Sequence, residues 1–166
     1  MVTWPLTFGV FCRRKINRVR RPFVAGNWKM NGSLSDLSSL VGGICEGCVG
    51  GQQTEIAICP PFVYLSKVIE LVAGSAVGVG AQSLANEKPG AFTGEVAGEM
   101  LRDIGCRYVI VGHSERRTNH GETDSQVCEK AVAARRAGLI PVVCVGETEV
   151  QRDAGEALAT VGRQLA

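Results

Sequence analysis

Five short, nearly continuous apolar runs constrain the fold of this chain more than any other feature. They are rich in Val, Ile and Ala and lie at residues 23–28, 56–59, 77–81, 108–111 and 140–145. A strand with one face in water alternates apolar and polar residues, whereas these runs do not alternate. The pattern therefore predicts parallel strands that are buried on both faces.

The segments between these runs have the spacing of amphipathic helices. A loop with Gly or Pro follows each run, and apolar residues then recur on one helical face. These helical stripes cover residues 34–44, 65–72, 96–104, 127–134 and 150–165. Tandem strand–helix units predict an α/β fold, either a doubly wound sheet or a closed barrel. Periodicity does not choose between the two, but no G-x-G-x-x-G motif follows the first run, so a dinucleotide loop is not predicted there.

Polar side chains follow two of the predicted strands where they end. His113 follows the fourth run after a glycine, and Asn27 and Lys29 lie at the end of the first. Asn27 and Lys29 are two residues apart, so on an extended segment they point the same way. A carboxamide, an ammonium group and an imidazole at strand ends could converge on one oxygen-rich ligand.

The residues after His113 predict the start of a helix. Ser114 can cap a helical turn, and Glu115 in its first turn suits the positive end of the helix dipole. Backbone N–H groups facing the imidazole would favour a neutral ring that donates a hydrogen bond. The alternative interpretation is that His113 only packs or caps at the end of a strand.

Five motifs resemble the triosephosphate isomerase family and occur in the family's order. They are AGNWKMN at 25–31, GAQ at 80–82, GAFTGE at 90–95, VIVGHSERR at 109–117 and PVVCVGE at 141–147. The resemblance implies a (β/α)8 TIM barrel, of which this chain holds about the first five units. Such a barrel typically needs ~250 residues. In this family the catalytic base is a glutamate at the end of the sixth strand, a mobile lid follows it, and the seventh and eighth loops bind the phosphate. None of these is found in residues 1–166.

The resemblance also implies a reaction. The family interconverts dihydroxyacetone phosphate and D-glyceraldehyde 3-phosphate through an enediolate, in glycolysis and gluconeogenesis, without a cofactor or metal. His113 matches the family's neutral electrophile, Lys29 the lysine that offsets substrate charge, and Asn27 the carboxamide that orients substrate. Lys29 and Asn27 are thus expected to bind substrate. Glu115 is expected either to hold Lys29 by an ion pair or to shuttle protons.

Other matched residues have expected supporting roles. Arg116 is expected to form a salt bridge under the site or at a subunit interface. Cys144 and Glu147 are expected to support the floor of the active site. Residues 90–95 resemble the loop that reaches a neighbouring subunit in this family, with Thr93 as the contact, which implies a homodimer. The alternative for this segment is a surface loop with a tight glycine turn.

Composition separates the first 21 residues from the rest. They hold six of the 18 basic residues and no acidic one, which leaves 12 basic against 16 acidic side chains in residues 22–166. We therefore expect a basic extension at 1–21, a partial barrel domain at 22–166, and no nucleic-acid surface. The apolar run at 4–12 is too short for a membrane span. A cytoplasmic protein is expected, and organellar targeting by the extension is the alternative.

The seven cysteines are expected to be reduced thiols. Their number is odd, and Cys59, Cys106 and Cys144 lie in or beside apolar runs. Cys45 and Cys48 form a single C-x-x-C pair, which is a weak signal for a metal site.

Two functions remain open on the sequence alone. The first is a triosephosphate isomerase whose base-bearing segment is absent from this chain, which is then expected to have little activity by itself. The second is a non-catalytic fragment or interaction module that complements a second chain. In a solitary fragment, residues 23–28 and 140–145 are expected to form open apolar edges of the sheet that are liable to aggregation.

Overall fold

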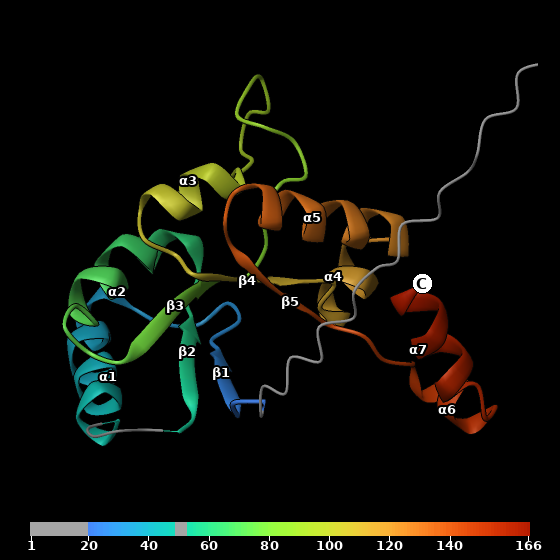
Figure 1. Cartoon of the computed structure of the whole chain (residues 1–166), viewed down its shortest axis with the longest axis horizontal. Helices are drawn as coiled ribbons and strands as arrows, with labels where there is room; N and C mark the ends of the chain where they lie inside the picture. The colour runs from blue at the N-terminus through green and yellow to red at the C-terminus, as the bar shows by residue number, and fades with distance from the viewer. Residues whose placement is uncertain (1–19, 49–52) are drawn as a thin grey trace, which may run out of the picture.

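The computed structural model describes residues 20–48 and 53–166 and contains one parallel sheet. Its strands are β1 (Phe23–Asn27), β2 (Glu55–Cys59), β3 (Val77–Ala81), β4 (Tyr108–Val111) and β5 (Ile140–Val143), and each pairs with the next along the chain (Figure 1). All five predicted strands are confirmed, with ends that differ by at most two residues. A doubly wound sheet reverses its strand order at a switch point, so this uninterrupted order indicates a partial TIM barrel.

Burial differs between the middle and the edges of the sheet. β4 is buried throughout, and β2 and β3 are mostly buried, as their apolar sequences predict. The prediction of burial on both faces is wrong for β1 and β5, where Val24 is 57% and Ile140 46% exposed. The reason is their position, because no described strand pairs with their outer sides. The expected open apolar edges are therefore present.

Helices lie between the strands as predicted, and β4 is followed by two of them. They are α1 (Leu34–Gly47), α2 (Leu65–Leu71) preceded by the 3-10 turn η1 (Phe62–Tyr64), α3 (Gly98–Asp103), α4 (Ser114–Asn119) and α5 (Asp124–Arg136). Helix α5 begins with a capping box, in which Thr123 and Gln126 each accept a hydrogen bond from the other's backbone N–H. It ends just before Gly138, whose φ of 78° is left-handed.

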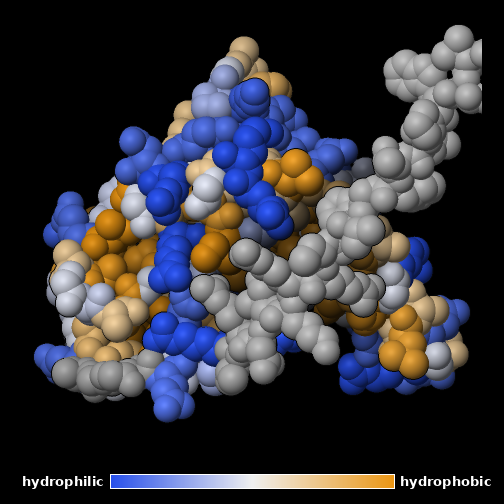
Figure 2. Space-filling view, viewed as in Figure 1, coloured by the Kyte–Doolittle hydropathy of each residue, from blue (hydrophilic) through white to orange (hydrophobic). Residues whose placement is uncertain are grey.

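The last predicted helix is two helices. The sequence predicted one helix over 150–165, but α6 (Glu149–Asp153) and α7 (Ala157–Leu165) are separated by Gly155 with a φ of 74°. Apolar residues of the predicted stripe are exposed here, with Leu158 at 89% and Val150 at 78%. Figure 2 shows hydrophobic residues at the surface of this pair of helices.

The core lies between the sheet and helices α1, α2, α3 and α5. Its largest fully buried side chains come from α1, α2, α3 and β4 and from the loop after β3: Leu37, Val41, Leu65, Val68, Leu84, Leu101, Val109 and Val111. Of the expected basic extension, residues 1–19 lie outside the described residues. No helix among the described residues is both long and apolar enough to cross a membrane.

Candidate active site

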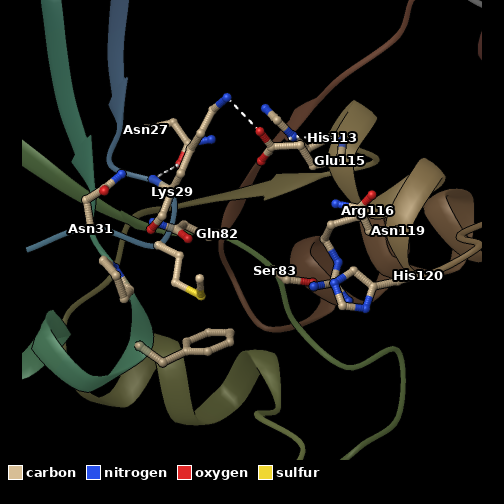
Figure 3. Close-up of a pocket in the computed structure, with 13 residues that line it drawn as sticks. Asn27, Lys29, Asn31, Gln82, Ser83, His113, Glu115, Arg116, Asn119 and His120 are labelled. Carbon is tan, nitrogen blue, oxygen red and sulfur yellow. Dashed lines mark hydrogen bonds and ion pairs between the residues drawn. The ribbon is translucent and has the colours of Figure 1, made fainter.

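One pocket opens at the carboxyl ends of the strands. Its volume is about 580 Å³. The four predicted catalytic residues Asn27, Lys29, His113 and Glu115 all line it (Figure 3). The rest of the lining is Met30, Asn31, Pro61, Phe62, Gln82, Ser83, Arg116, Asn119 and His120. Ligands of parallel α/β proteins bind at this edge of the sheet, so the pocket is the candidate active site.

The end of β1 holds Asn27 and Lys29 in a fixed turn. The Oδ1 of Asn27 accepts a hydrogen bond from the backbone N–H of Lys29 at 2.9 Å, which leaves the Nδ2 of Asn27 as a donor. Lys29 is the one non-glycine residue with positive φ in the described part of the chain, at 53°. This left-handed conformation costs a non-glycine residue roughly 1–2 kcal/mol, so its surroundings must hold it.

Gln82 supplies that support. It directly follows β3, and its side-chain amide donates to the carbonyl oxygens of Lys29 and Cys59, each at 2.8 Å. One side chain thus joins the ends of β1 and β2. The sequence placed Gln82 in the short motif at 80–82, but its position just after a strand was the only sign of this role.

The turn into His113 depends on Gly112. Its φ is 70°, and a Cβ at this position would lie 2.7 Å from the Cγ1 of Val127, so only glycine fits without a shift. The chain therefore leaves β4 sharply, and His113 lies at the start of α4.

His113 itself caps α4, which corrects the predicted cap at Ser114. Its Nδ1 accepts a hydrogen bond from the backbone N–H of Glu115 at 3.2 Å, whereas Ser114 is already the first helical residue. The Nδ1 also lies 3.6 Å from the Oε2 of Glu115, which is too long for a hydrogen bond. An accepting Nδ1 carries no proton, so the neutral ring has its proton on Nε2. His113 therefore offers one N–H donor to the pocket.

Lys29 and Glu115 form an ion pair across the pocket. The Nζ of Lys29 lies 2.6 Å from the Oε1 of Glu115, and both side chains are about half exposed. The hydrogen bond from Lys29 holds the pKa of the Glu115 carboxyl below its usual range. Of the two expected roles for Glu115, this contact fits the one in which it positions Lys29.

Behind the pocket, the carboxylate of Glu122 forms ion pairs with two cationic side chains. Its Oε1 accepts from the Nε of Arg116 and from the Nζ of Lys130, the latter at 2.6 Å, and its side chain is 6% exposed. Burial alone would raise the pKa of Glu122, but the hydrogen bonds from Lys130 and Arg116 outweigh it and the pKa lies below its usual range. Lys130 also donates to Ser83. Arg116 thus forms the salt bridge expected under the site.

Three other predicted residues lie outside this pocket. Glu147 pairs with Arg152 at 2.7 Å and lines a separate groove, so it does not support the floor. The carbonyl of Cys144 accepts from Arg117 at 3.5 Å, and burial raises the pKa of its half-buried thiol. Thr93 is exposed in the loop before α3.

The described residues hold no cluster of three or more His, Cys, Asp or Glu side chains suited to a metal ion. Cys45 and Cys48 lie at the end of α1 as free thiols. The pocket instead brings together three donors, the Nζ of Lys29, the Nδ2 of Asn27 and the Nε2 of His113. This set suits an anionic or carbonyl oxygen. Asn119 and His120 at its far side were not predicted from the sequence.

Comparison with known proteins agrees with this geometry. The family model for triosephosphate isomerase matches residues 22–166. The triosephosphate isomerases of Cupriavidus taiwanensis and Moorella thermoacetica are 54% and 50% identical over 147 residues, which is 89% of this chain and 59% of each relative. The crystal structure of triosephosphate isomerase from Bartonella henselae superposes with a TM-score of 0.80 at 40% identity, covering 88% of this chain and 60% of that one. This chain thus spans about three fifths of its relatives' length, and it belongs to the triosephosphate isomerase family.

Proposed function

We propose that this chain supplies the substrate-polarising part of a triosephosphate isomerase, which interconverts dihydroxyacetone phosphate and D-glyceraldehyde 3-phosphate. The observation that carries the proposal is the hydrogen bond from the backbone N–H of Glu115 to the Nδ1 of His113. In the neutral ring this bond leaves the proton on Nε2, where the N–H is available to substrate oxygens next to the ammonium group of Lys29.

The proposed reaction moves a proton between adjacent carbons. A base removes the carbon-bound proton, and negative charge develops on the substrate oxygens as the enediolate forms. The Nε2–H of His113 and the Nδ2 of Asn27 then donate to those oxygens, while Lys29 offsets the charge. Glu115 keeps Lys29 in position through their 2.6 Å ion pair. The base itself is assigned to none of the described residues.

We also propose that the complete protein is a homodimer. Support comes from the loop that carries Thr93, which stands clear of α3 and α5 in Figure 1. Phe92 beside it is 48% exposed, and an exposed aromatic residue on a projecting loop is typical of a contact surface. Thr93 is the proposed contact residue.

The activity proposal is tested with the full chain, alone and co-expressed with the part of the Cupriavidus taiwanensis relative that lies beyond the match. Conversion of dihydroxyacetone phosphate is measured for His113→Gln, with His120→Gln as a matched control in the same pocket. We expect activity only in the co-expressed sample. We expect His113→Gln to lower kcat by roughly 10²–10⁴-fold and His120→Gln to leave it within a few fold. Equal activity in the two variants would contradict the proposal.

A second candidate function is an interaction module that pairs with a separate chain without catalysis. The exposed apolar residues of the sheet edges favour it, with Val24 on β1 and Val143 on β5 at 57% and 41% exposure. Sheet edges of this kind pair readily with another strand. Co-purification of a one-to-one partner with no isomerase activity in the complex would select this function over the first.

A further inference from the structure

The loop between β3 and α3 is closed at its base by backbone pairing. Ala85 and Ala97 form a bridge, and the N–H of Ala85 donates to the carbonyl of Val96 at 2.9 Å. Residues 86–96, the projecting loop, therefore leave and rejoin the fold at one place. The loop forms the apex of the space-filling view in Figure 2.

Arg136, at the last turn of α5, contacts the start of this loop and the helix that follows it. Its Nη2 donates to the carbonyl of Glu87 at 3.2 Å, and its Nη1 and Nη2 each lie 3.4 Å from the carbonyl of Asn86. Its Nε donates to the Oε1 of Glu99 at 3.2 Å, in the first turn of α3. One guanidinium thus joins the start of the loop to the helix that follows it. The planar fork of arginine suits this convergence, whereas lysine has a single ammonium group.

A second side chain of α5 holds the same segment. The Oε2 of Glu129 accepts from the Nδ2 of Asn86 at 3.0 Å. Glu129 lies seven residues before Arg136, which is two helical turns, so both project from one face of α5. Gly98 lets the start of α3 approach the end of α5 closely, because a Cβ there would lie 2.9 Å from the Cβ of Ala137.

We propose that Arg136, assisted by Glu129, is a positioning residue for self-association: α5 presets the projecting loop in the conformation in which it contacts a second copy of this chain. The inference rests on the proposed homodimer. Holding a loop in its bound conformation lowers the entropy cost of binding, so association tightens without any contact from Arg136 to the partner.

The full chain carries a matched control for this inference. Arg135 is also exposed on α5, and in the described part of the chain its side chain makes no hydrogen bond or ion pair. Arg136→Gln and Arg135→Gln remove the same charge from adjacent positions of one helix. Hydrogen exchange of the amides of residues 87–95 reports the conformation of the loop, and sedimentation at several concentrations reports association. Hydrogen exchange and sedimentation are both measured with the full chain co-expressed with the part of the Cupriavidus taiwanensis relative that lies beyond the match.

Arg136→Gln is expected to speed exchange in the loop about tenfold and to weaken association about tenfold, because it removes the charge-assisted hydrogen bonds of the guanidinium to the loop and to Glu99. Arg136→Lys should be intermediate, and Arg135→Gln should match the unchanged chain. Equal loop exchange in the two glutamine variants would overturn the inference. Faster exchange in Arg136→Gln with unchanged association would overturn the link to docking. A protein that is monomeric at every concentration would refute the proposed homodimer, while the loop exchange would still test the hold of α5 on the loop.

Discussion

Gln82→Leu tests how the fold holds Lys29 in its left-handed conformation. The substitution keeps the size of the side chain but removes the two hydrogen bonds to the carbonyls of Lys29 and Cys59, each 2.8 Å long. A hydrogen bond contributes about 1 kcal/mol net to stability, so the loss of two should cost at most about 2 kcal/mol in the free energy of unfolding. The carbonyl of Cys59 keeps a second donor, the N–H of Trp28 at 3.1 Å, and Lys29 is open to water. We therefore expect a loss of about 1–2 kcal/mol in the free energy of unfolding.

Urea unfolding of the full chain measures this loss. With a slope of about 2 kcal/mol per molar urea, the midpoint should fall by roughly 0.5–1 M. Gln53→Leu is the matched control, since Gln53 is exposed, and it should shift the free energy of unfolding by less than about 0.5 kcal/mol. Gln82→Glu should cost more than Gln82→Leu, because a carboxylate would face two carbonyl oxygens without a proton to donate. Equal midpoints for Gln82→Leu and Gln53→Leu would refute the reasoning.

Four further predictions concern stability. Glu122→Ala leaves Lys130, whose side chain is 12% exposed, without its carboxylate and should cost about 3–5 kcal/mol in urea unfolding; a loss below about 1 kcal/mol would contradict the buried pair. Lys29→Gly should be more stable than Lys29→Ala by about 1–2 kcal/mol, because its φ is 53°. Gly112→Ala should destabilise the fold, because the φ of Gly112 is 70° and a Cβ there would lie 2.7 Å from Val127. Gly42→Ala should instead stabilise α1 by roughly 0.5–1 kcal/mol, because a Cβ at Gly42 has no atom within 4 Å, and the urea midpoints of the two variants measure both effects. Because the pKa of Glu122 is depressed in the folded state, its contribution to stability is complete above the pKa of an unfolded carboxyl group and is lost as pH falls through the folded pKa. The urea midpoint of Glu122→Gln should therefore fall less on acidification than that of the unchanged chain.

The sheet was predictable from the sequence because each strand is a single local pattern. Apolar runs bounded by Gly or Pro predicted all five strands within two residues. Burial was predicted less well, because it depends on neighbours and not on the run itself. Ile140 is as apolar as Ile110, yet they are 46% and 4% exposed since β5 is an edge and β4 is not. The break at Gly155 was missed because a stripe over 150–165 keeps helical spacing through it.

The sequence predicted which residues form the candidate site but not the hydrogen bonds between them. Strand ends and the family resemblance indicated Asn27, Lys29, His113 and Glu115, and the pocket brings them together. The cap was predicted at Ser114, one residue late, because serine is a far commoner cap than histidine. Gln82 is joined to Lys29 across 53 residues of sequence, and no local pattern reports such a contact.

The tautomer of His113 tests the central claim most directly, because the proposed chemistry needs its Nε2 to carry a proton. The chain has two histidines, so a ¹⁵N spectrum of histidine-labelled full chain shows two rings, and the spectrum of His113→Gln assigns them. We predict that His113 has an unprotonated, hydrogen-bonded Nδ1 and a protonated Nε2 at neutral pH. A ring that carries its proton on Nδ1 would contradict the account, because His113 would then offer the pocket no N–H donor.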